Sequence, residues 1–493
     1  MKRLIICCDG TWDAPDQSAN GLPAPTNVFK LSNCVVRGEA NGIEQLVYYH
    51  TGVGSTGNRI QQWLGGAMGI GITRHICSAY HWLALNYEEG DEIFLFGFSR
   101  GAFCVRSLAS FLDYGLLDLV GLSPKEGWHR VHQTFSSGYR EKLHDTTQWA
   151  EPTWRFFHNG SPPEIQFLGV WDTVGALGIP DTLRFTNIFD RPSHWQFFDT
   201  ELKPHIKTAR HAMSLDEMRA SFTVTRWINC PTHGDCKEVW FPGVHADVGG
   251  GYGRSGLADC ALLWMMEEAA QAGLILKTGI KKQLSPDPLS ILHNSYQGFF
   301  AKLPSRPRNI PEICTENNQL FHPGVFQRQH SPLVNYPPYR PSTLLAPKQS
   351  ITITIHAATP WNYTGIYLKR VAHYTFREAE EWQDKKDVCD WAGEWQQSLT
   401  PGNLVRKAVP WLKRARKLPW FVLVGAITND GEKEVAVPND GSPVDHQYEQ
   451  LSLYQEKPLV LQQSGYLYCF ANDARRFYTN NHGSIELTIT RVD

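Results

Sequence analysis

The chain has 493 residues, of which 42% are hydrophobic and 19% are charged, and its formal net charge is −2. This length exceeds what one hydrophobic core supports, so two or three domains are expected. The small net charge gives the whole chain no attraction for nucleic acid, and we expect no nucleic-acid partner. The 11 cysteines include no C-x-x-C pair, which predicts free thiols in a reducing compartment and neither a disulfide framework nor a zinc site.

The first predicted element is a strand over residues 3–8 that runs into Asp9-Gly10-Thr11. The apolar part of this strand is too short for a secretory signal peptide. No run in the chain approaches the roughly 18 apolar residues of a membrane-spanning helix. We therefore expect synthesis in the cytoplasm without a signal peptide.

The segment Gly97-Phe98-Ser99-Arg100-Gly101 lies between an apolar run at 92–96 and apolar residues at helical spacing over 102–112. A G-x-S-x-G serine on a sharp strand-to-helix turn presents its hydroxyl to a cleft, and the flanking glycines let the backbone bend. We therefore predict that Ser99 is a nucleophile. A serine hydroxyl is weak until a base removes its proton, so the chain must also supply a base and an acid.

Two later strand ends supply these partners. Apolar runs at 165–171 and 238–244 are followed by Asp172 and His245 respectively, and three glycines follow the histidine. The order serine, acid, histidine is that of α/β-hydrolases, and catalytic groups gather at the carboxyl ends of strands in open parallel sheets. The sequence therefore predicts a triad of Ser99, Asp172 and His245.

Other residues compete for two of these roles. Asp172 would equally serve to cap a following helix, and Asp247 is a second candidate acid. His211 and His322 are the alternative bases, and a lone histidine is more often structural than catalytic. These alternatives stay open on the sequence alone.

The tetrahedral intermediate of acyl transfer needs two hydrogen-bond donors for its oxyanion. We predict the backbone amide of Arg100, the residue after the nucleophile, as one donor and the amide of Gly10 or Thr11 as the other. In an alternative interpretation Asp9 is an aspartyl-phosphate nucleophile, although that chemistry usually has a second carboxylate where Thr11 stands. No cofactor is expected for catalysis.

Two segments are candidate lipid contacts. The glycine-rich apolar run 63–72 precedes a helical stretch at 73–87, and is either a flap beside an acyl groove or a closely packed buried loop. The aromatic segment 184–198 lies between the predicted acid and base, where hydrolases of this fold insert a cap. An exposed aromatic cap would favour lipids over soluble esters as substrates.

Several motifs in order resemble one known family, the α/β-hydrolase lipase effectors of bacterial type VI secretion, a class long catalogued as an uncharacterised domain. The resemblance covers about residues 1–345. The motifs are Asp9-Gly10-Thr11-Trp12, Tyr49-His50-Thr51-Gly52-Val53-Gly54, Gly97-Phe98-Ser99-Arg100-Gly101-Ala102, residues 169–175, residues 240–252, and His322-Pro323-Gly324-Val325 with Arg328.

This resemblance implies phospholipase A activity on a phospholipid membrane, with Ser99, Asp172 and His245 as the triad. It also implies secretion by a type VI-like machine, with a secretion spike protein and an immunity protein as partners. The same triad would serve a carboxylesterase or a neutral-lipid lipase. A function of a different class is a carbohydrate-binding scaffold on a hydrolase fold that has lost its activity.

The character of the sequence changes near residue 300, where proline becomes frequent and helical periodicity is lost. From Ser350 isoleucines alternate with threonines, which is typical of a strand. Further strands are predicted at 421–427, 458–463, 466–471 and 485–490. The predicted domains are an α/β-hydrolase domain with a mostly parallel sheet at 1–303, a proline-rich connection packing on it at 304–347, and an all-β sandwich at 348–493.

The segment 472–484 resembles the calcium loop of small galactose-binding bacterial lectins, which implies a targeting module with a carbohydrate ligand. The oxygen ligands implied for calcium are the side chains of Asp473, Asn480 and Asn481 and the carbonyl of Phe477. Calcium takes about six to eight oxygen ligands, of which these would supply several. Ordinary turn chemistry explains the Asn-Asp and Asn-Asn pairs as well.

A basic segment completes the list of candidate sites. Residues 403–417 contain no acid, and Trp411 and Trp420 lie within or beside them. The basic residues are Arg406, Lys407, Lys413, Arg414, Arg416 and Lys417. Such a segment suits an anionic lipid surface, although a solvated loop or a docking site for a partner fits equally.

Overall fold

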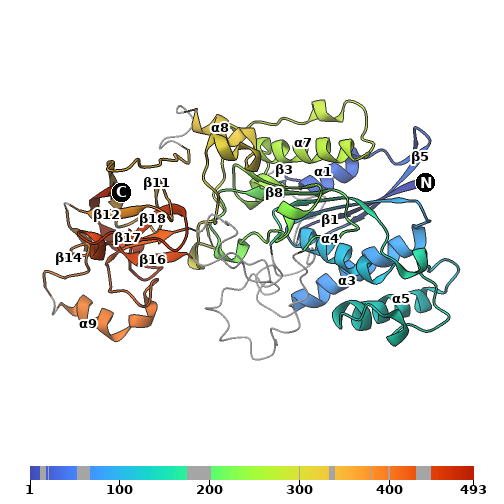
Figure 1. The fold of residues 1–493 in the computed structure, drawn as a ribbon, viewed down its shortest axis with the longest axis horizontal. Helices are drawn as coiled ribbons and strands as arrows, with labels where there is room; N and C mark the ends of the chain where they lie inside the picture. The colour runs from blue at the N-terminus through green and yellow to red at the C-terminus, as the bar shows by residue number, and fades with distance from the viewer. Residues whose placement is uncertain are drawn as a thin grey trace. The chain divides into compact units, whose positions relative to one another are not determined.

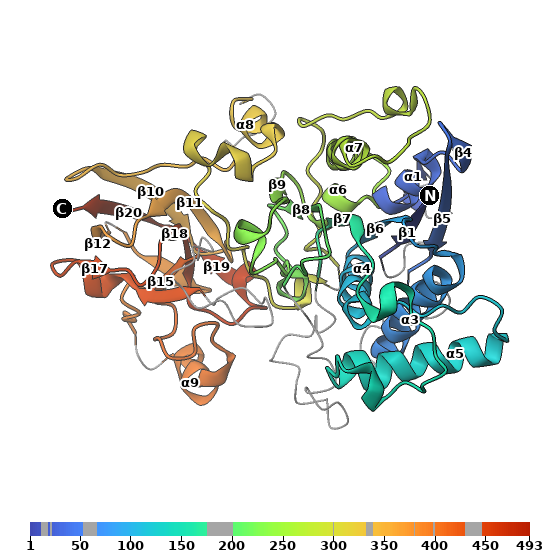
Figure 2. The same ribbon diagram turned by 45° about the vertical axis from the view of Figure 1, so that its right-hand side comes forward.

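The structure is a computed structural model, drawn in Figure 1 and turned by 45° in Figure 2. It describes residues 1–10, 18–19, 22–52, 67–174, 201–298, 300–331, 339–378, 380–397, 400–428 and 446–493.

The described residues form two compact units. The N-terminal unit is Met1–Ser295 with Gln319–Arg328, and the C-terminal unit is Tyr296–Asn318 with the described residues from Gln329 onward. The proline-rich segment is thus divided between the two units. The domain boundaries expected from the sequence stay a prediction.

A seven-stranded sheet forms the centre of the N-terminal unit, in the order β4-β5-β1-β6-β7-β8-β9. Its strands are β1 (Lys2–Cys8), β4 (Gly38–Ala40), β5 (Ile43–His50), β6 (Glu92–Phe98), β7 (Ile165–Trp171), β8 (Ala209–Ser214) and β9 (Cys236–Phe241). Neighbours from β5 to β9 are parallel, and the β4–β5 pair is antiparallel. After β1 the chain adds β5 on one side and β6 on the other. The carboxyl ends of β1 and β6 therefore meet at a switch in strand order, where ligands bind in open α/β sheets.

Helices cover both faces of this sheet, as Figures 1 and 2 show. Helices α3, α4 and α5 pack on one face, and α1 and α7 on the other. Their bounds are α1 (Asn27–Cys34), α3 (Ala67–Asn86), α4 (Arg100–Phe111), α5 (Pro124–Gln133) and α7 (Gly256–Gln271). The unit also contains α6 (His245–Gly249) and all but the last residue of α8 (Pro323–Gln329). In β1, Leu4 and Ile6 pack in the core formed with α3, α4 and α5, while Ile5 and Cys7 pack in the core formed with α1 and α7. A strand buried on both faces is apolar throughout, which explains why these strands were visible in the sequence.

The elements predicted around the serine, acid and base are confirmed with small shifts of their ends. The apolar runs at 92–96, 165–171 and 238–244 form β6, β7 and β9, and the helix after Ser99 is α4. Strand β8 is not predicted by the sequence.

The flap expected at 63–72 is wrong for its second half, because residues from Ala67 onward form the first turns of α3. Ile72 is buried there, so apolar periodicity outweighs the two glycines in this stretch. Residues 63–66 and the cap expected at 184–198 lie outside the described residues.

The C-terminal unit contains two four-stranded antiparallel sheets, ordered β10-β20-β12-β17 and β11-β18-β15-β16. The strands are β10 (Ser350–His356), β11 (Asn362–Leu368), β12 (His373–Arg377), β15 (Leu423–Ile427), β16 (Gln447–Gln450), β17 (Leu459–Val460), β18 (Gly465–Ala471) and β20 (Ser484–Arg491). Apolar side chains from both sheets share one core. The predicted strands are confirmed, although only two residues of 458–463 form β17.

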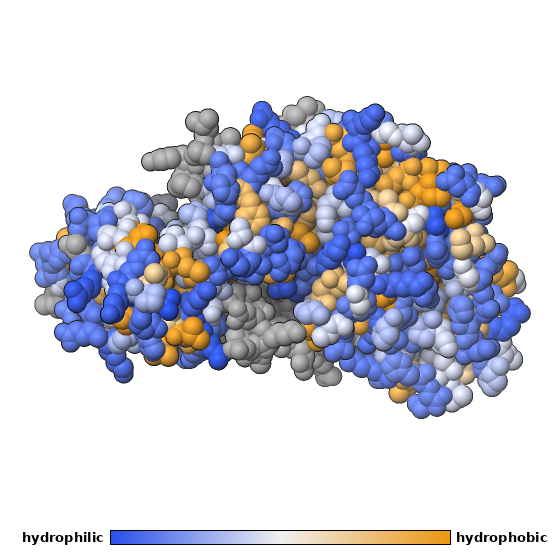
Figure 3. All heavy atoms as spheres, turned by 45° about the horizontal axis from the view of Figure 1, so that its top comes forward, coloured by the Kyte–Doolittle hydropathy of each residue, from blue (hydrophilic) through white to orange (hydrophobic). Residues whose placement is uncertain are grey.

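Smaller elements lie beside these sheets. A three-stranded sheet joins β13 (Trp382–Asp384) to β14 (Asp387–Cys389) and β19 (Asn481–His482), and α9 is Pro401–Ala408. Within the described ranges, no helix is both long enough and apolar enough to cross a membrane. On the face drawn in Figure 3 hydrophilic residues cover most of the surface, and apolar residues form smaller patches between them.

The expectation of free thiols is wrong for two cysteines. Cys230 and Cys236 form a disulfide just before and at the start of β9, while the other nine are free. The two cysteines lie six residues apart with no motif between them, and only the fold brings their sulfur atoms together.

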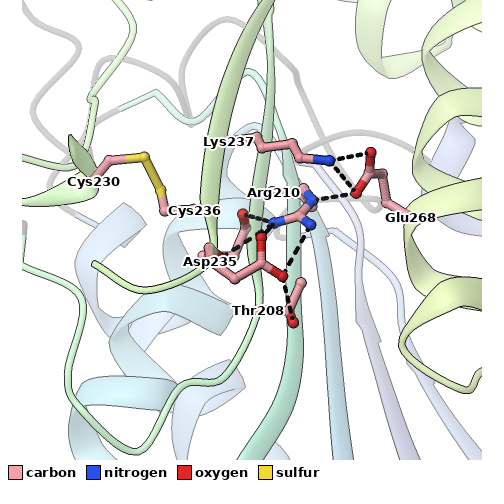
Figure 4. Close-up of polar contacts among 8 residues, drawn as sticks. Thr208, Arg210, Cys230, Asp235, Cys236, Lys237 and Glu268 are labelled. Atoms are coloured by element: carbon pink, nitrogen blue, oxygen red, sulfur yellow. Dashed lines mark hydrogen bonds and ion pairs between the residues drawn. A yellow bond between two sulfur atoms is a disulfide. The ribbon is translucent and has the colours of Figure 1, made fainter. Parts of the chain in front are cut away.

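An ionic network lies close to this disulfide, as Figure 4 shows. The buried Arg210 guanidinium of β8 contacts Asp235 at 2.8 Å and Glu268 of α7 at 2.6 Å, and Lys237 contacts Glu268 at 2.8 Å. These pairs join β8, β9 and α7 near the amino ends of the strands, and they compensate the buried charge of Arg210.

Counting thiols tests this correction. Protein purified without reductant, denatured and alkylated, should carry nine labels by intact mass, and reduction should expose two more. Peptide mapping should place the added labels on Cys230 and Cys236. Eleven labels before reduction would show that this pair is not oxidised.

Candidate active site

The predicted nucleophile lies on a strained turn between β6 and α4. Ser99 is buried and has φ 58° and ψ −121°, outside the regions that non-glycine residues usually occupy. Its amide donates to the carbonyl of Trp171 at 3.0 Å, which ties the turn to the end of β7. The positive φ is thus carried by the serine itself.

The two glycines of the motif provide space. A Cβ on Gly101 would lie 2.1 Å from the carbonyl oxygen of Cys8 in β1, and a Cβ on Gly97 would lie 2.5 Å from the carbonyl oxygen of Gly101. No real Cβ approaches a backbone atom so closely. The motif therefore lets the start of α4 lie against the ends of β1 and β6.

The predicted acid and base contact each other. Asp172 directly follows β7, with φ 41°, and its Oδ2 lies 2.5 Å from Nδ1 of His245. Because a carboxylate accepts, Nδ1 carries the proton and Nε2 is left as the basic nitrogen of this tautomer. The other carboxylate oxygen accepts the amide of Ser214 at 2.8 Å. Asp172 is fully buried, so its orientation is fixed.

Phe98, the residue before Ser99, brings the serine turn into contact with His245. The Phe98 ring centroid lies 4.6 Å from that of His245. A Cβ on Gly249 would lie only 1.9 Å from the Phe98 ring, so the absence of a side chain at Gly249 makes room for this ring. Ser99, Asp172 and His245 thus follow the carboxyl ends of β6, β7 and β9, at one edge of the sheet.

Burial controls the charge of the histidine. It lowers the pKa of His245, and the hydrogen bond and charge of Asp172 oppose that shift without cancelling it. The imidazole is therefore neutral near pH 7, which is the state a general base requires.

Sequence reasoning missed a second buried carboxylate beside this histidine. Glu217 accepts the His245 amide at 3.2 Å and pairs with Arg219 at 2.8 Å. It follows no strand motif, so no sequence pattern distinguishes it from an exposed acid.

The competing acid belongs to another pair. Asp247 lies 2.6 Å from Nδ1 of His293, whose ring stacks on Tyr252, and it also accepts the amide of Val244 at 3.1 Å. It therefore caps the short helix α6 and orients a second histidine. His293 has no sequence motif around it and was also missed.

The competing bases make structural contacts. The fully buried His211 lies 3.2 Å from Glu238 and accepts the amide of Thr173 at 3.1 Å. His322 accepts the amide of Gly324 at 3.1 Å and stacks on Phe241. Burial lowers the pKa of His322 to about 4.

The two predicted oxyanion regions differ. Arg100 is the first residue of α4 and directly follows Ser99, and its amide stays the predicted first donor. The Gly10 amide donates to the carboxylate of Asp9 at 2.8 Å, which favours Thr11 over Gly10 as the predicted second donor. Thr11 lies outside the described residues, and its amide stays the predicted second donor.

Asp9 is a buried structural group. Its second oxygen accepts the hydroxyls of Thr26 and Tyr49, each at 2.6 Å. Burial raises its pKa to about 6 despite these donors. These contacts occupy both carboxylate oxygens and disfavour the aspartyl-phosphate interpretation.

The predicted calcium ligands lie in the C-terminal unit. Asp473 is buried, and its Oδ2 and the Oδ1 of Asn481 have no hydrogen-bond partner among the described residues. The Phe477 carbonyl accepts the amide of Asn480 at 3.1 Å. Two buried oxygens without donors are compatible with a cation. They are equally compatible with an Asn481 amide turned to donate to Asp473, a contact that partly offsets the rise that burial causes in the pKa of this carboxyl.

Sequence reasoning missed the groups around this loop. Asn480 donates to Asp384 of β13, and Arg406 of α9 pairs with both Asp384 and Asp387. Burial, and then the charge of Asp384, raise the pKa of Asp473 to about 6. Across the described ranges no three His, Cys, Asp or Glu side chains are grouped to hold a metal ion.

With this geometry in place, comparison with known proteins decides the family. A family model described as the catalytic domain of the Tle1-like phospholipase effectors of type VI secretion matches residues 2–268. The chain belongs to this family. The matched residues include all three members of the predicted triad and the disulfide pair.

Individual relatives are more distant. The chain is 33% identical over 238 residues to the uncharacterised protein YEL023C of Saccharomyces cerevisiae, covering 45% of this chain and 32% of the yeast protein. A crystal structure of an uncharacterised protein from Pseudomonas aeruginosa matches with 20% identity and a TM-score of 0.37, covering 59% of this chain and 49% of that one. A structure of the Tle1 effector bound to the VgrG spike matches with 18% identity and a TM-score of 0.30, covering 51% of each chain. The chain spans about a third of the yeast relative and about half of each solved chain.

Proposed function

We propose that this chain is a serine hydrolase of the phospholipase A type, in which Ser99, His245 and Asp172 form the catalytic triad. The observation that carries the proposal is the 2.5 Å contact between Asp172 and His245 beside the strained serine turn. Family membership supports a lipolytic effector secreted by a type VI machine.

The reaction follows from these roles. His245 Nε2 takes the proton of the Ser99 hydroxyl as the serine oxygen attacks the acyl carbonyl, and the oxyanion is held by the Arg100 amide and a donor near Thr11. The histidine then gives the proton to the departing lysophospholipid oxygen, leaving an acyl-serine. Water, deprotonated by the same nitrogen, then attacks the acyl carbon. The histidine returns that proton to the Ser99 oxygen as the bond to serine breaks and the fatty acid leaves. Asp172 keeps Nδ1 protonated and stabilises the imidazolium formed in each step.

The finer assignments belong to this proposal. A phospholipid membrane is the substrate, and a secretion spike protein and an immunity protein are the partners that a type VI effector requires. A carboxylesterase or a neutral-lipid lipase would use the same residues. An inactive scaffold would release no fatty acid from any lipid, so profiling the products by lipid class separates the three functions.

The nucleophile and base are tested together. Ser99→Ala should abolish labelling by a fluorophosphonate and lower kcat on phosphatidyl substrates on the order of 10⁴-fold, because the triad acts as a unit. His245→Ala should be about as severe, and the double variant should add little. Mass spectrometry and fatty-acid release provide the two readouts.

His293→Ala is the matched control, because it removes a histidine from a similar Asp–His pair. It should keep both labelling and turnover. Loss of activity in a folded His293→Ala protein, with His245→Ala still active, would reassign the base.

The pH profile tests the electrostatics. Because burial lowers the pKa of His245 in the folded protein, the midpoint of the acid limb of kcat/KM should lie below the ordinary pKa of histidine. Activity should fall as the pH drops through this folded-state pKa. The contribution of this histidine to the free energy of unfolding should also be lost as the pH falls, because the unfolded state binds the proton more readily than the folded state. Asp172→Asn removes the group that raises this pKa, so the acid limb should move to lower pH while the plateau drops. An acid limb that moves to higher pH would contradict the assignment.

For the C-terminal unit we propose a calcium-binding, carbohydrate-recognising module. Its ligands are Asp473, Asn480, Asn481 and the carbonyl of Phe477, and the support is the pair of buried oxygens without donors. Arg406 already neutralises Asp384 in the same region, which weakens the demand for a cation.

Melting of the full-length protein tests the calcium site. Calcium at a hundredfold excess over its Kd should stabilise the folded state by about 2.7 kcal/mol, and Asp473→Ala should abolish the effect. Hydrolysis of small soluble esters should be insensitive to chelator. A melting temperature indifferent to both calcium and chelator would leave 472–484 as an ordinary turn.

A further inference from the structure

A cavity of about 560 Å³ lies within the C-terminal unit. The residues of the proposed triad do not line it. Three arginines line it, Arg414 from the basic segment and Arg475 and Arg476 from the loop at 472–484. Among the described residues no carboxylate lines it, and the other polar groups there are the hydroxyls of tyrosine, serine and threonine side chains. The cavity therefore has a strongly positive wall.

Arg414 is held rigidly at this wall. Its guanidinium carbon lies 3.7 Å from the ring centroid of Phe470 and 4.2 Å from that of Trp361. Its Nη1 donates to the carbonyl of Pro360 and to the hydroxyl of Tyr478, both neutral acceptors. Its Nη2 is buried and has no hydrogen-bond partner among the described residues. Within the described part of the molecule, this fixed guanidinium therefore keeps one donor unused and makes no ion pair.

The two loop arginines are exposed, and for neither is a hydrogen bond or ion pair found within the described part of the chain. Three like charges around one cavity repel one another, and an anion between them would remove that repulsion. Arg406, in the same basic segment, differs from these three arginines, because its guanidinium forms ion pairs with two carboxylates.

We propose that this cavity binds a phosphate-bearing ligand, with its phosphoryl group held between Arg414, Arg475 and Arg476. Guanidinium groups match the oxygens of a phosphate in bidentate geometry, and a phosphate's several oxygens can engage more than one arginine. Ser305 and Thr479 line the cavity and add hydroxyl donors, while Tyr296 offers an aromatic wall to the remainder of the ligand. The proposal is independent of the triad and of the calcium ligands, none of which it uses.

A phosphoryl group reaches such a cavity either on an anionic lipid head group or on a soluble phosphate, and two binding assays distinguish these sources. Full-length protein carrying Ser99→Ala, so that lipids stay intact, is titrated with inorganic phosphate and glycerol phosphate by calorimetry. The same protein is sedimented with phosphatidylcholine vesicles with and without phosphatidic acid. Binding in the first assay alone assigns a soluble phosphate, and binding confined to the phosphatidic acid vesicles assigns the head group.

Arg475→Ala with Arg476→Ala is the pocket variant, because both side chains are exposed and their loss should not disturb folding. It should weaken binding about tenfold or more, as expected for lost charge-assisted hydrogen bonds. Arg377→Ala with Lys386→Ala is the control, removing equal charge from exposed positions that do not line the cavity. With Ser99 restored, both double variants should hydrolyse small soluble esters as the parent does, so a failed phosphate site is distinguishable from a failed triad.

Binding that the pocket variant loses and the control keeps supports the site. Equal weakening by the two double variants would show that diffuse surface charge is responsible, and would overturn it. Absence of binding to every phosphate probe by the parent protein would overturn it as well.

Discussion

Helix α4 begins closer to strand β1 than any side chain at Gly101 would allow. The Cα of this glycine packs on the carbonyl of Cys8, and Gly97 faces Gly101 in turn. Ser99, between them, takes a positive φ that costs about 1–3 kcal/mol and persists only where surrounding packing enforces it. The residues of α4 after its first are buried, which supplies that packing. The position of the nucleophile is thus fixed by backbone contacts.

The acid is positioned by polar groups buried inside the sheet. Strand β8 lies between β7 and β9, and its His211 accepts the amide of Thr173, the residue directly after Asp172. Burial would raise the pKa of Glu238, but Arg226 and then His211 hold it at about 2, so this carboxylate stays charged and paired. A satisfied polar pair in the sheet interior gives the backbone at Asp172 one arrangement, because any shift would leave a buried group without its partner.

The sequence predicted the apolar strands and the residues at their ends, because strands buried on both faces are continuous hydrophobic runs. It did not predict β8, in which Arg210 and His211 are buried beside partners that are distant in sequence. The Glu217 contact with His245 was missed for the same reason. Cys230 and Cys236 are close in sequence but form no recognisable motif, so their pairing was missed as well. Local pattern reveals hydrophobic burial, but the compensation of a buried charge depends on which residues the fold brings together.

The motif glycines show a related limit. The sequence suggested that Gly97 and Gly101 supply conformational freedom, whereas the structure assigns the unusual backbone to Ser99 and the need for space to the glycines. A residue type can therefore be predicted correctly while its physical reason is not.

The same distinction applies to charge in the C-terminal unit, where Arg406 and Arg414 belong to one basic run in the sequence. Arg406 is neutralised by two aspartates, whereas among the described residues the Arg414 guanidinium contacts aromatic rings and neutral oxygens and no carboxylate. A net charge of −2 thus conceals a local excess of positive charge that only the structure resolves, and such an excess is where an anionic ligand gains most.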